Sequence, residues 1–355
     1  MNKPFARRSY DGNQSSRMIN SRGAVLLLVL WTVTLLTIFA LAIGTAIRQK
    51  MILVSRLSSR GEMVGLLRSG FQKARAYFML NEDLQGQPFS RVNGKQLCFN
   101  NPPAFQGILS EGGFAVQYNN YDLGADQPRI MFGLEDEERK LNINTAEEEE
   151  LQRLFILAGG IKPEPAQDLA QAVIDWRTYG ESEIVGFYGD AYYSNLKHPY
   201  EPKDAPFEVL EEVLLVKGMN PDRFARLKPF MTVYGSGRVN INTVSRPVLL
   251  ALGMSPAVTD KIVLGRKGAD GLEATRDDFI FRSSEGASIN INGFVDLRAE
   301  ELAELDSLFV GGKITTESTV YTAHVQAMLE RSDENRGLEC IFRAKDAKIL
   351  RWQML

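Results

Sequence analysis

The pattern of apolar and polar residues predicts a membrane span near the N-terminus of the chain. Residues 24–47 contain no charged side chain, and they stand between Arg22 and Arg48. A helix of this length extends roughly 36 Å, and the hydrocarbon core of a bilayer is about 30 Å thick. The pattern therefore predicts one transmembrane helix that carries the rest of the chain.

The helical pattern continues beyond this span to about Leu80. Apolar residues recur every seven positions from Leu57 to Phe78, and other apolar residues fill the three-and-four spacing between them. Such a stripe is typical of a helix that packs one face on its own domain. We expect the second half to pack in this way, while the upper half can also pack on neighbouring subunits.

Segments with a strand pattern occur at both ends of the body. The expected strands cover residues 114–118, 129–134, 319–328, 338–343 and 349–354. Residues 81–112 are rich in Gly, Pro, Asn and Gln and are predicted as loop, and Asn119-Asn120 is expected in a turn. A long helix with antiparallel strands gives an α+β fold in which the sheet wraps the helix.

Between these strands lies an internal repeat of helix-turn-helix units. The segments Leu141 to Thr145 (LNINT) and Val239 to Thr243 (VNINT) each precede two predicted helices. We expect their Asn and Thr side chains to cap helices. A third unit is predicted at 206–227, with Pro221 opening its second helix. The expected helices are 147–157, 165–177, 246–252, 256–266, the helix after Pro221, and 294–309.

The order of these elements predicts the domain organisation. Strands before and after the helical block indicate that a helical domain is inserted into a sheet domain. The predicted parts are a leader at 1–23, an N-terminal helix at 24–80 with its span at 24–47, a sheet domain at 81–140 and 313–355, and an inserted all-α domain at 141–312.

The charge distribution predicts the orientation of the chain in the membrane and argues against one class of partner. Residues 1–23 carry five basic residues and one acidic residue, so this end is expected in the cytoplasm and the body outside it. Without them the net charge changes from -3 to -7. An acidic body argues against a generic nucleic-acid partner, because phosphate binding needs clustered Lys and Arg.

The junction between Gly23 and Ala24 resembles the cleavage site of a type IV prepilin. The apolar run exceeds the about 7–15 residues of an ordinary signal peptide, and no Ala-x-Ala pattern precedes Arg48. In prepilins the leader is removed on the cytoplasmic face and the apolar segment becomes the new N-terminus. An uncleaved signal anchor fits this segment equally well.

The helical units also resemble helix-hairpin-helix motifs, which bind DNA phosphates through a turn with two glycines. None of the corresponding turns, at 158–162, 216–220 and 252–255, has two glycines at the spacing that this motif requires. Acidic residues at 147–150 would repel phosphate. These two features argue against DNA binding. A membrane-anchored DNA receptor is therefore only the alternative function. A signal-anchored enzyme has less support, because neither His198 nor His324 lies in a recognisable catalytic motif.

Carboxylates in two loops are candidates for a calcium site, since Ca²⁺ takes hard oxygen ligands at irregular spacing. The first set is Asp175, Glu181, Glu183 and Asp190, and the second, weaker set is Asp270, Glu273, Asp277 and Asp278. Solvated acidic loops are the alternative interpretation. The two cysteines, Cys98 and Cys340, permit one disulfide in an oxidising compartment.

Several long segments resemble the general secretion pathway protein K family, the large minor pseudopilins of type II secretion. The resemblance extends from about Arg22 to the C-terminus. Its most specific segments are AVLLLVLW after the Arg-Gly junction, LNINTAEEEELQRL, AVIDWR, DAYYSNLKHPYEPKDAPFEVLEEVLLVKGM, LKPFMTVYGSGRVNINT and TTESTVYTAHVQAML. It implies a pilin-like fold with an inserted domain of helix-hairpin-helix or SAM-like repeats.

The resemblance further implies processing, partners and place in the cell. Prepilin peptidase would remove the leader after Gly23, with N-methylation of Ala24. The protein would be a non-enzymatic, single-pass protein of the inner membrane with its body in the periplasm. It would sit at the pseudopilus tip with the I and J minor pseudopilins, within reach of the outer-membrane secretin or exoproteins, and bind calcium.

One position in the span has a physical explanation within this family. Most pilins carry a Glu at the fifth mature position, where it pairs with the N-terminal amine of the subunit ahead. Counted from Ala24, this position is Leu28. A carboxylate at membrane depth is costly unless it is paired. Because a tip subunit has no subunit ahead, an apolar residue at Leu28 is expected there.

Overall fold

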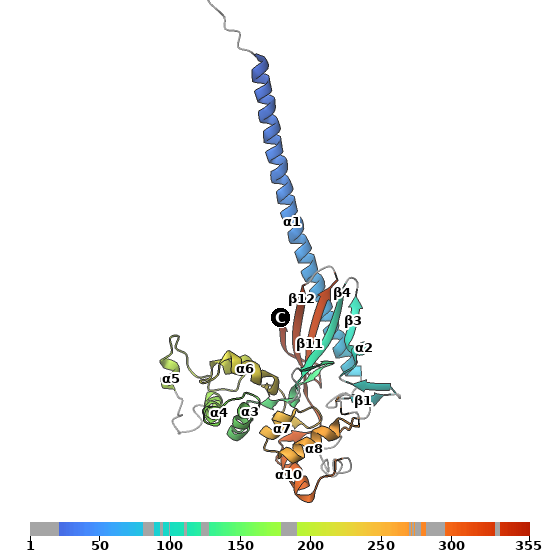
Figure 1. The fold of residues 1–355 in the computed structure, drawn as a ribbon, viewed down its shortest axis with the longest axis vertical. Coiled ribbons are helices and arrows are strands. Elements are labelled where there is room, and N and C mark those ends of the chain that lie inside the picture. Colours follow the sequence, from blue (N-terminus) through green and yellow to red (C-terminus); the bar gives the residue numbers. More distant parts are fainter. Residues whose placement is uncertain are drawn as a thin grey trace, which may run out of the picture. The chain divides into compact units, whose positions relative to one another are not determined.

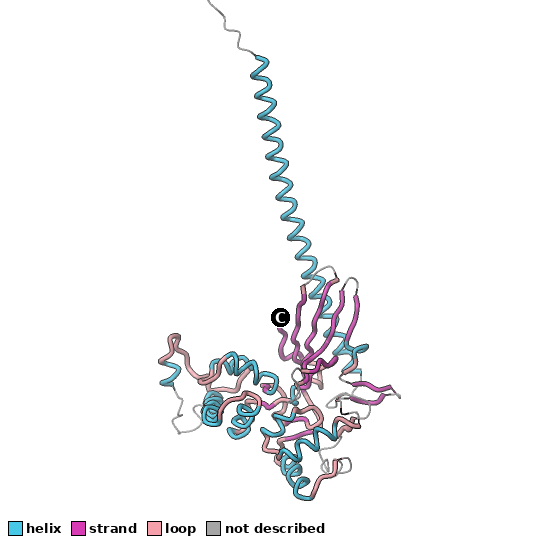
Figure 2. Tube along the Cα trace, in the orientation of Figure 1, coloured by secondary structure: helices cyan, strands magenta, loops and turns pink. Residues whose placement is uncertain are grey.

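The computed structural model describes residues 21–80, 89–92, 95–98, 100–109, 112–121, 128–178, 190–269, 271, 273, 278–281, 295–330 and 334–355. These residues form two units, one up to Gly61 and one from Glu62 to Leu355. Figure 1 labels their helices and strands and colours them along the sequence, and Figure 2 colours them by secondary structure.

Helix α1 (Ser21–Leu80) confirms the prediction of one long N-terminal helix. Among the described parts of the chain, it is the one helix long and apolar enough to cross a membrane. Its side chains from Gly23 to Ser58 are exposed. From Met63 onward one face becomes buried, and Phe71 and Phe78 on that face are fully covered.

An antiparallel sheet of seven strands forms the second part of the α+β fold. Its main order is β13-β12-β11-β4-β3, while β5 pairs with β4 and β6 pairs with β11. The strands are β3 (Gln106–Leu109), β4 (Gly112–Asn120), β5 (Arg129–Phe132), β6 (Glu135–Asp136), β11 (Val320–Leu329), β12 (Asn335–Arg343) and β13 (Ile349–Met354). The predicted strands in both parts of the sequence are therefore present, and β13 has the predicted bounds.

The buried face of α1 packs on this sheet. The Phe78 ring lies 4.7 Å from the Tyr321 ring of β11, centroid to centroid, and 5.9 Å from the Phe342 ring of β12. Gly70 permits the close approach, because a Cβ atom there would stand 2.6 Å from Val325 Cγ1. The expected arrangement, a sheet packed on the second half of the helix, is confirmed.

The prediction of a loop at 81–112 is wrong where the structure describes that segment. It contains β1 (Phe89–Val92), β2 (Lys95–Cys98), helix α2 (Pro102–Phe105) and β3. These elements are only four residues long, and β3 is placed by backbone pairing with β4 and not by an apolar pattern of its own. Asn119 and Asn120, expected in a turn, extend β4 and pair with β5.

Helices and short parallel ladders lie between β6 and β11 in the sequence. The ladders pair β7 (Leu141–Asn142) with β8 (Met231–Thr232), and β9 (Val239–Asn240) with β10 (Ile314–Thr315). The helices are η2 (Glu137–Arg139), α3 (Glu148–Leu157), α4 (Pro163–Thr178), α5 (Asp190–Ser194), η3 (Leu210–Leu215), α6 (Pro221–Leu227), η4 (Lys228–Phe230), α7 (Arg246–Ala251), α8 (Pro256–Arg266) and α10 (Ala299–Val310). They surround a second hydrophobic core, separate from the core beneath α1.

The third predicted unit differs in its first helix. Leu210, Val213 and Val216 are buried at intervals of three residues, and the segment forms the 3₁₀ helix η3. A repeat of three suits a 3₁₀ helix, which has three residues per turn. The second helix, α6, begins at Pro221 as predicted, and Asn220 caps it by accepting a hydrogen bond from the Arg223 amide at 2.9 Å.

Candidate functional site

The residues predicted for processing and for the tip position lie in α1. Gly23 and Ala24 are helical, because α1 begins at Ser21. Leu28 is 65% exposed, as are its apolar neighbours to a similar degree. Residues 1–20, which hold most of the expected leader, lie outside the described residues.

The first carboxylate set is described only in part. Asp175 lies near the end of α4, Asp190 begins α5, and Glu181 and Glu183 lie outside the described residues, as does the Asp190 side chain. One Asp175 oxygen accepts a hydrogen bond from Gln171 Nε2 at 2.8 Å. The other oxygen, Oδ2, is buried and has no hydrogen-bond partner among the described residues.

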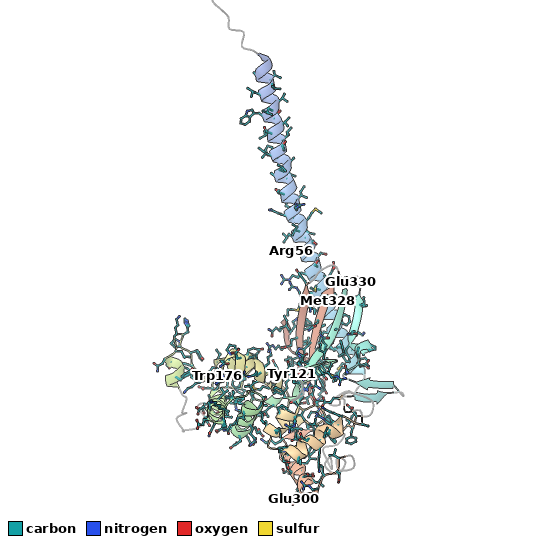
Figure 3. All side chains as sticks on the ribbon, in the orientation of Figure 1. Arg56, Tyr121, Trp176, Glu300, Met328 and Glu330 are labelled. Carbon is teal, nitrogen blue, oxygen red and sulfur yellow. The ribbon has the colours of Figure 1, made fainter. Side chains whose placement is uncertain are left out.

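A second unsatisfied polar atom follows directly in the sequence. Trp176 Nε1 is buried and also lacks a partner within the described part of the chain. The Trp176 ring, labelled in Figure 3, lies 5.5 Å from the Tyr193 ring and 6.3 Å from the Phe207 ring. Because buried polar atoms rarely lack a partner, the end of α4 is where a ligand or the following loop is expected to supply one.

The second carboxylate set and the two cysteines provide less support for a metal site or a disulfide. Glu273 is held by Arg266 at 2.9 Å and by Asn120 at 2.6 Å, while Asp270 and Asp277 lie outside the described residues. Within the described part of the chain, no group of three His, Cys, Asp or Glu side chains could hold a metal ion. Cys340 is buried, and the Cys98 side chain is not described, so the disulfide stays a prediction.

The sequence analysis missed a buried run of six charged residues from Glu135 to Lys140. It covers strand β6, helix η2 and the residue before β7, and each residue is at most 9% exposed. A run of charges usually marks a solvated surface, since burying an unpaired charge is very costly. Only the long-range contacts of these residues explain their burial.

Asp136, the second residue of the run, binds both the second NINT segment and a residue just before β11. Its carboxylate accepts hydrogen bonds from Thr243 Oγ1 at 2.5 Å, Asn240 Nδ2 at 3.0 Å and Ser318 Oγ at 2.7 Å. Burial disfavours the charged form and raises the pKa of Asp136 to about 6, although these hydrogen bonds act in the opposite direction.

The next acid, Glu137, also contacts two segments that are far apart in the sequence. It accepts hydrogen bonds from Thr232 Oγ1 of β8 at 2.5 Å and from Thr322 Oγ1 of β11 at 2.6 Å. Glu138 accepts from the Ser236 amide at 2.7 Å and from the Thr319 amide at 2.5 Å. Each of the three acids therefore joins residues 232–243 to residues 318–322.

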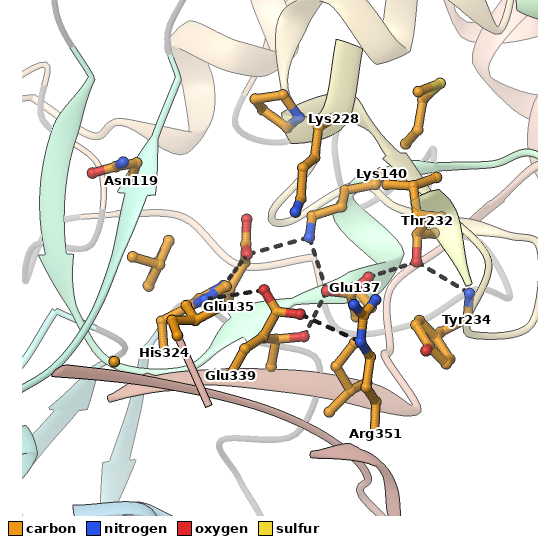
Figure 4. Close-up of a pocket in the computed structure, with 18 of the residues that line it drawn as sticks. Asn119, Glu135, Glu137, Lys140, Lys228, Thr232, Tyr234, His324, Glu339 and Arg351 are labelled. Carbon is orange, nitrogen blue, oxygen red and sulfur yellow. Dashed lines mark hydrogen bonds and ion pairs between the residues drawn. The ribbon is translucent and has the colours of Figure 1, made fainter. Parts of the chain in front are cut away.

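Glu135 and Lys140, at the two ends of the run, form the core of a chain of ion pairs (Figure 4). Lys140 Nζ lies 3.2 Å from Glu135 Oε2 and 2.8 Å from Glu137 Oε1. Burial favours the neutral form of Glu135, but Lys140 and the His324 hydrogen bond outweigh it and lower the pKa of Glu135. Likewise burial favours neutral Lys140, yet the two glutamates raise its pKa.

The chain of ion pairs continues from the sheet to the helices. His324 Nε2 lies 2.8 Å from Glu135, and His324 Nδ1 lies 3.8 Å from Glu339 of β12. Arg351 of β13 lies 3.8 Å from Glu339 and 2.9 Å from Glu211 of η3. These groups border a half-open cavity of about 350 Å³ between the sheet and helices η3, α6 and η4.

The chemistry of this cavity favours a structural role. Both ring nitrogens of His324 face carboxylates, so the ring joins Glu135 of β6 to Glu339 of β12. Buried ion pairs of this kind are weak evidence for stability, but removing one partner leaves an uncompensated charge. The arrangement therefore couples the sheet to the helices and makes their contact sensitive to single substitutions.

The two NINT segments are also fastened by polar contacts, although not in the predicted way. The N-cap positions of α3 and α7 are held by Glu147 and Ser245, which follow the NINT segments, so the prediction that the Asn and Thr side chains cap these helices is wrong. Instead, Asn144 donates to the Phe207 carbonyl at 3.0 Å and accepts from its amide at 2.8 Å. The Asn side chains satisfy backbone groups of distant segments, which sequence spacing could not indicate.

The second repeat contains the same contact. Asn242 donates to the Phe281 carbonyl at 2.9 Å and accepts from the Phe281 amide at 2.8 Å. The preceding asparagines, Asn142 and Asn240, each accept from the amide two residues ahead. The repeated sequence thus corresponds to repeated hydrogen bonding.

One family model matches part of the chain. Residues 125–236 match the family model described as type II secretion system (T2SS), protein K. The matched segment contains the buried charged run and the first NINT segment. Among the curated proteins no match was found.

One solved structure is similar in fold. It is described as the crystal structure of the GspK-GspI-GspJ complex from the enterotoxigenic Escherichia coli type 2 secretion system. The TM-score is 0.56 and the sequence identity is 16%, with 84% of this chain and 99% of that chain covered. Neither comparison supports the DNA-binding alternative.

Proposed function

We propose that this chain, whose residues 125–236 match the type II secretion protein K family, is a minor pseudopilin of a type II secretion system. The family match is the observation that carries this proposal. The long apolar helix and the antiparallel sheet packed on it agree with it, because the fold is similar to a chain of the GspK-GspI-GspJ complex. Its role is assembly and not catalysis.

The partners of this pseudopilin are the I and J minor pseudopilins, and its place is the tip of the pseudopilus. The solved structure of similar fold is a complex of the K, I and J proteins, which supports these partners. Leu28 supports the tip position, because it presents an apolar side chain where most pilins need a paired Glu. The chain initiates and caps the pseudopilus for the export of folded proteins.

The first half of α1 anchors the protein in the inner membrane, with the body in the periplasm. The support is the single apolar helix together with the five basic residues before it. Prepilin peptidase removes the leader after Gly23, and Ala24 becomes the methylated N-terminus. The outer-membrane secretin and exoproteins lie on the side that the body faces.

Residues 141–312 form the inserted helical domain of this pseudopilin, and its repeats are of the helix-hairpin-helix type. Two observations support this proposal. Strands β6 and β11, which stand on either side of the segment in sequence, pair directly at Tyr321 and Asp136. The Asn144 and Asn242 contacts are the same in the two repeats. The bulk of this domain prevents the addition of a further subunit above it.

Calcium is the proposed structural cofactor of the segment after α4. The buried free oxygen of Asp175 fits such an ion, since Ca²⁺ prefers carboxylate oxygens. Glu181, Glu183 and Asp190 are the other proposed ligands. Titration calorimetry with CaCl₂ tests this: the Asp175→Asn variant should bind more weakly than the unmodified chain, whereas Asp222→Asn, at the exposed start of α6, should not differ from it.

Co-purification tests the proposed function. Tagged full-length chain is expressed with the I and J pseudopilins, extracted in mild detergent and analysed by size-exclusion chromatography with mass determination. We expect a stable complex that contains all three proteins. If I and J associate with each other but not with this chain, the proposed function is wrong. Binding of duplex DNA by the same preparation at moderate salt would favour the alternative receptor role.

A further inference from the structure

Strand β13 lies at one edge of the seven-stranded sheet. Among the described residues it pairs with β12 alone, from Leu338 opposite Met354 to Phe342 opposite Ile349. The backbone groups on its outer side therefore have no strand partner within the described sheet. Such an edge is a template for another strand, and natural proteins usually protect it.

The register identifies which backbone groups face outward. The Leu355 amide donates to the Gly337 carbonyl at 2.8 Å, and the Gly337 amide donates to the Leu355 carbonyl at 3.4 Å. Directly opposed residues of antiparallel strands alternate between hydrogen-bonded and non-hydrogen-bonded pairs. The N–H and C=O groups of Met354 and Trp352 consequently point away from β12, toward the open edge.

The side chains of these residues form an apolar shelf on the face of the sheet that carries α1. Trp352 places its ring 5.5 Å from the Phe71 ring of α1. Ile349 and Met354 share this face, because they stand opposite Phe342 and Leu338 of β12, whose side chains belong to the core beneath α1. The three side chains of the shelf (Ile349, Trp352 and Met354) remain 39–42% exposed. Arg351, on the opposite face, is instead ion-paired with Glu211 and Glu339.

From Arg351 onward this strand lacks the usual protective features of an edge. Its sequence, ILRWQM, contains no Pro and no Lys, and its one charged side chain, Arg351, points to the face away from α1. The register irregularity falls between Ile341 and Phe342 of β12, opposite the start of β13. From Arg351 to Met354 the edge is regular and open to a further strand.

The turn before β13 is positively charged. Lys345 and Lys348 are exposed, and no ion pair is formed by either within the described part of the chain. Asp346, the acid between them, is held by Arg343 at 2.6 Å. A partner strand that ends beside this turn is therefore favoured if it carries a carboxylate there.

On the basis of the minor pseudopilin role proposed above, we propose that the β13 edge receives an extended strand of a partner minor pseudopilin. That strand places apolar residues beside the shelf of Ile349, Trp352 and Met354. Its acidic end lies beside Lys345 and Lys348. Main-chain hydrogen bonds to Trp352 and Met354 provide the affinity, and the shelf and the two lysines provide the selectivity.

The experiment compares two substitutions at one residue in the full-length chain, co-expressed with the I and J pseudopilins. Met354→Pro removes the backbone N–H that points outward. Met354→Ala shortens the side chain but keeps this N–H. A proline is tolerated on an edge strand when its nitrogen faces solvent. The loss of one main-chain hydrogen bond between the strands lowers affinity about tenfold. The Pro variant should therefore weaken the complex about tenfold, and the Ala variant less than about threefold.

Hydrogen exchange provides the second readout. The amides of Trp352 and Met354 should exchange quickly in the chain alone and become protected in the complex. Lys345→Glu with Lys348→Glu should weaken the complex while leaving thermal unfolding unchanged, which tests the same surface if the Pro variant does not fold. Lys162→Glu with Lys197→Glu, at two other exposed lysines, is the charge-matched control and should have no effect.

The outcomes separate this edge from the proposed function. A complex of normal affinity with the Pro and Glu variants, with no protection at Trp352 or Met354, overturns the edge proposal and leaves the pseudopilin role intact. Protection of these amides in the chain alone at high concentration overturns it in favour of pairing between two copies. If the unmodified chain fails to bind I and J, the proposed function itself fails.

Discussion

Arg177 and Arg266 make the same contacts in two different parts of the chain. The Arg177 guanidinium donates to the carbonyls of Ile143 and Ala146, and the Arg266 guanidinium donates to the carbonyls of Ile241 and Val244. Each arginine lies at the end of the second helix of its repeat, and each fastens the turn that follows an NINT segment. The two repeats therefore share their polar framework, although their apolar residues differ.

The first prediction concerns Arg266, whose side chain is 5% exposed. Substitution by Met leaves the carbonyls of Ile241 and Val244 without donors and the Glu273 carboxylate without its cation. We expect a loss of roughly 3–5 kcal/mol in the free energy of unfolding, as for other broken buried ion pairs. Urea unfolding followed by circular dichroism measures this loss. Arg238→Met, at an exposed position, is the control and should change stability by less than about 0.5 kcal/mol.

The second prediction concerns the contact between α1 and the sheet. Gly70→Ala places a Cβ atom 2.6 Å from Val325 Cγ1 and 2.8 Å from the Phe114 ring, so helix and sheet must separate. We expect a destabilisation of about 1–3 kcal/mol, typical of overpacking. Gly65→Ala is the matched control, since nothing lies within 4 Å of its added methyl group.

In that control the helix propensity of Ala should increase stability by up to about 1 kcal/mol. Thermal unfolding of the two variants in parallel gives opposite signs if the close approach at Gly70 is correct. A stabilising Gly70→Ala substitution contradicts it.

The third prediction is a pH dependence that originates at Asp136. Because burial raises its pKa to about 6, the folded state binds a proton more readily than the unfolded chain. The stabilisation is fully present below the unfolded pKa of about 4 and is lost as the pH rises through 6. The stability advantage of the unmodified chain over Asp136→Asn should therefore fall by up to about 3 kcal/mol between pH 4 and pH 7.

The opposite sign is expected at Asp346. A hydrogen bond from Arg343 lowers the pKa of Asp346 to about 2, so its contribution is present above pH 4 and is lost as the pH falls toward 2. Urea unfolding of both Asn variants across pH 3–7 separates the two residues. Equal pH profiles for the unmodified chain and Asp136→Asn would refute the assignment.

The fourth prediction concerns Lys140, the buried cation of the charged run. Lys140→Met leaves Glu135 and Glu137 without their cation, and we expect a loss of roughly 3–5 kcal/mol in the free energy of unfolding. Lys228→Met removes the exposed end of the same chain of ion pairs, where its partner is Glu211 at 3.2 Å. The expected loss there is at most about 1 kcal/mol, as for other exposed pairs. Similar losses for both variants argue against the structural role of the buried run.

The sequence predicted the elements whose patterns are local. The heptad spacing of α1 and the alternation of β13 depend only on neighbouring residues, and so does the Pro-initiated helix α8. Four-residue strands such as β3 have no comparable pattern, because their position follows from pairing with β4.

The buried charged run could not be predicted for a related reason. Glu137 and Glu138 have the composition of a solvated surface. Apart from Lys140, the donors cited above for these two residues lie 95 to 185 residues away in the sequence. Only the fold brings these donors together, so burial and hydrogen bonding of the run become visible in the structure alone. The proposed calcium ligands beyond Asp175 still depend on the clustering of carboxylates in the sequence, because their side chains lie outside the described residues.

The mature N-terminus tests the central claim of a tip pseudopilin most directly. The full-length chain is isolated from membranes of cells that contain prepilin peptidase and is examined by intact mass and terminal sequencing. We predict a chain that begins at Ala24, with the mass of one added methyl group. A chain that still begins at Met1 in these cells contradicts the pseudopilin role and leaves a signal-anchored body of another function.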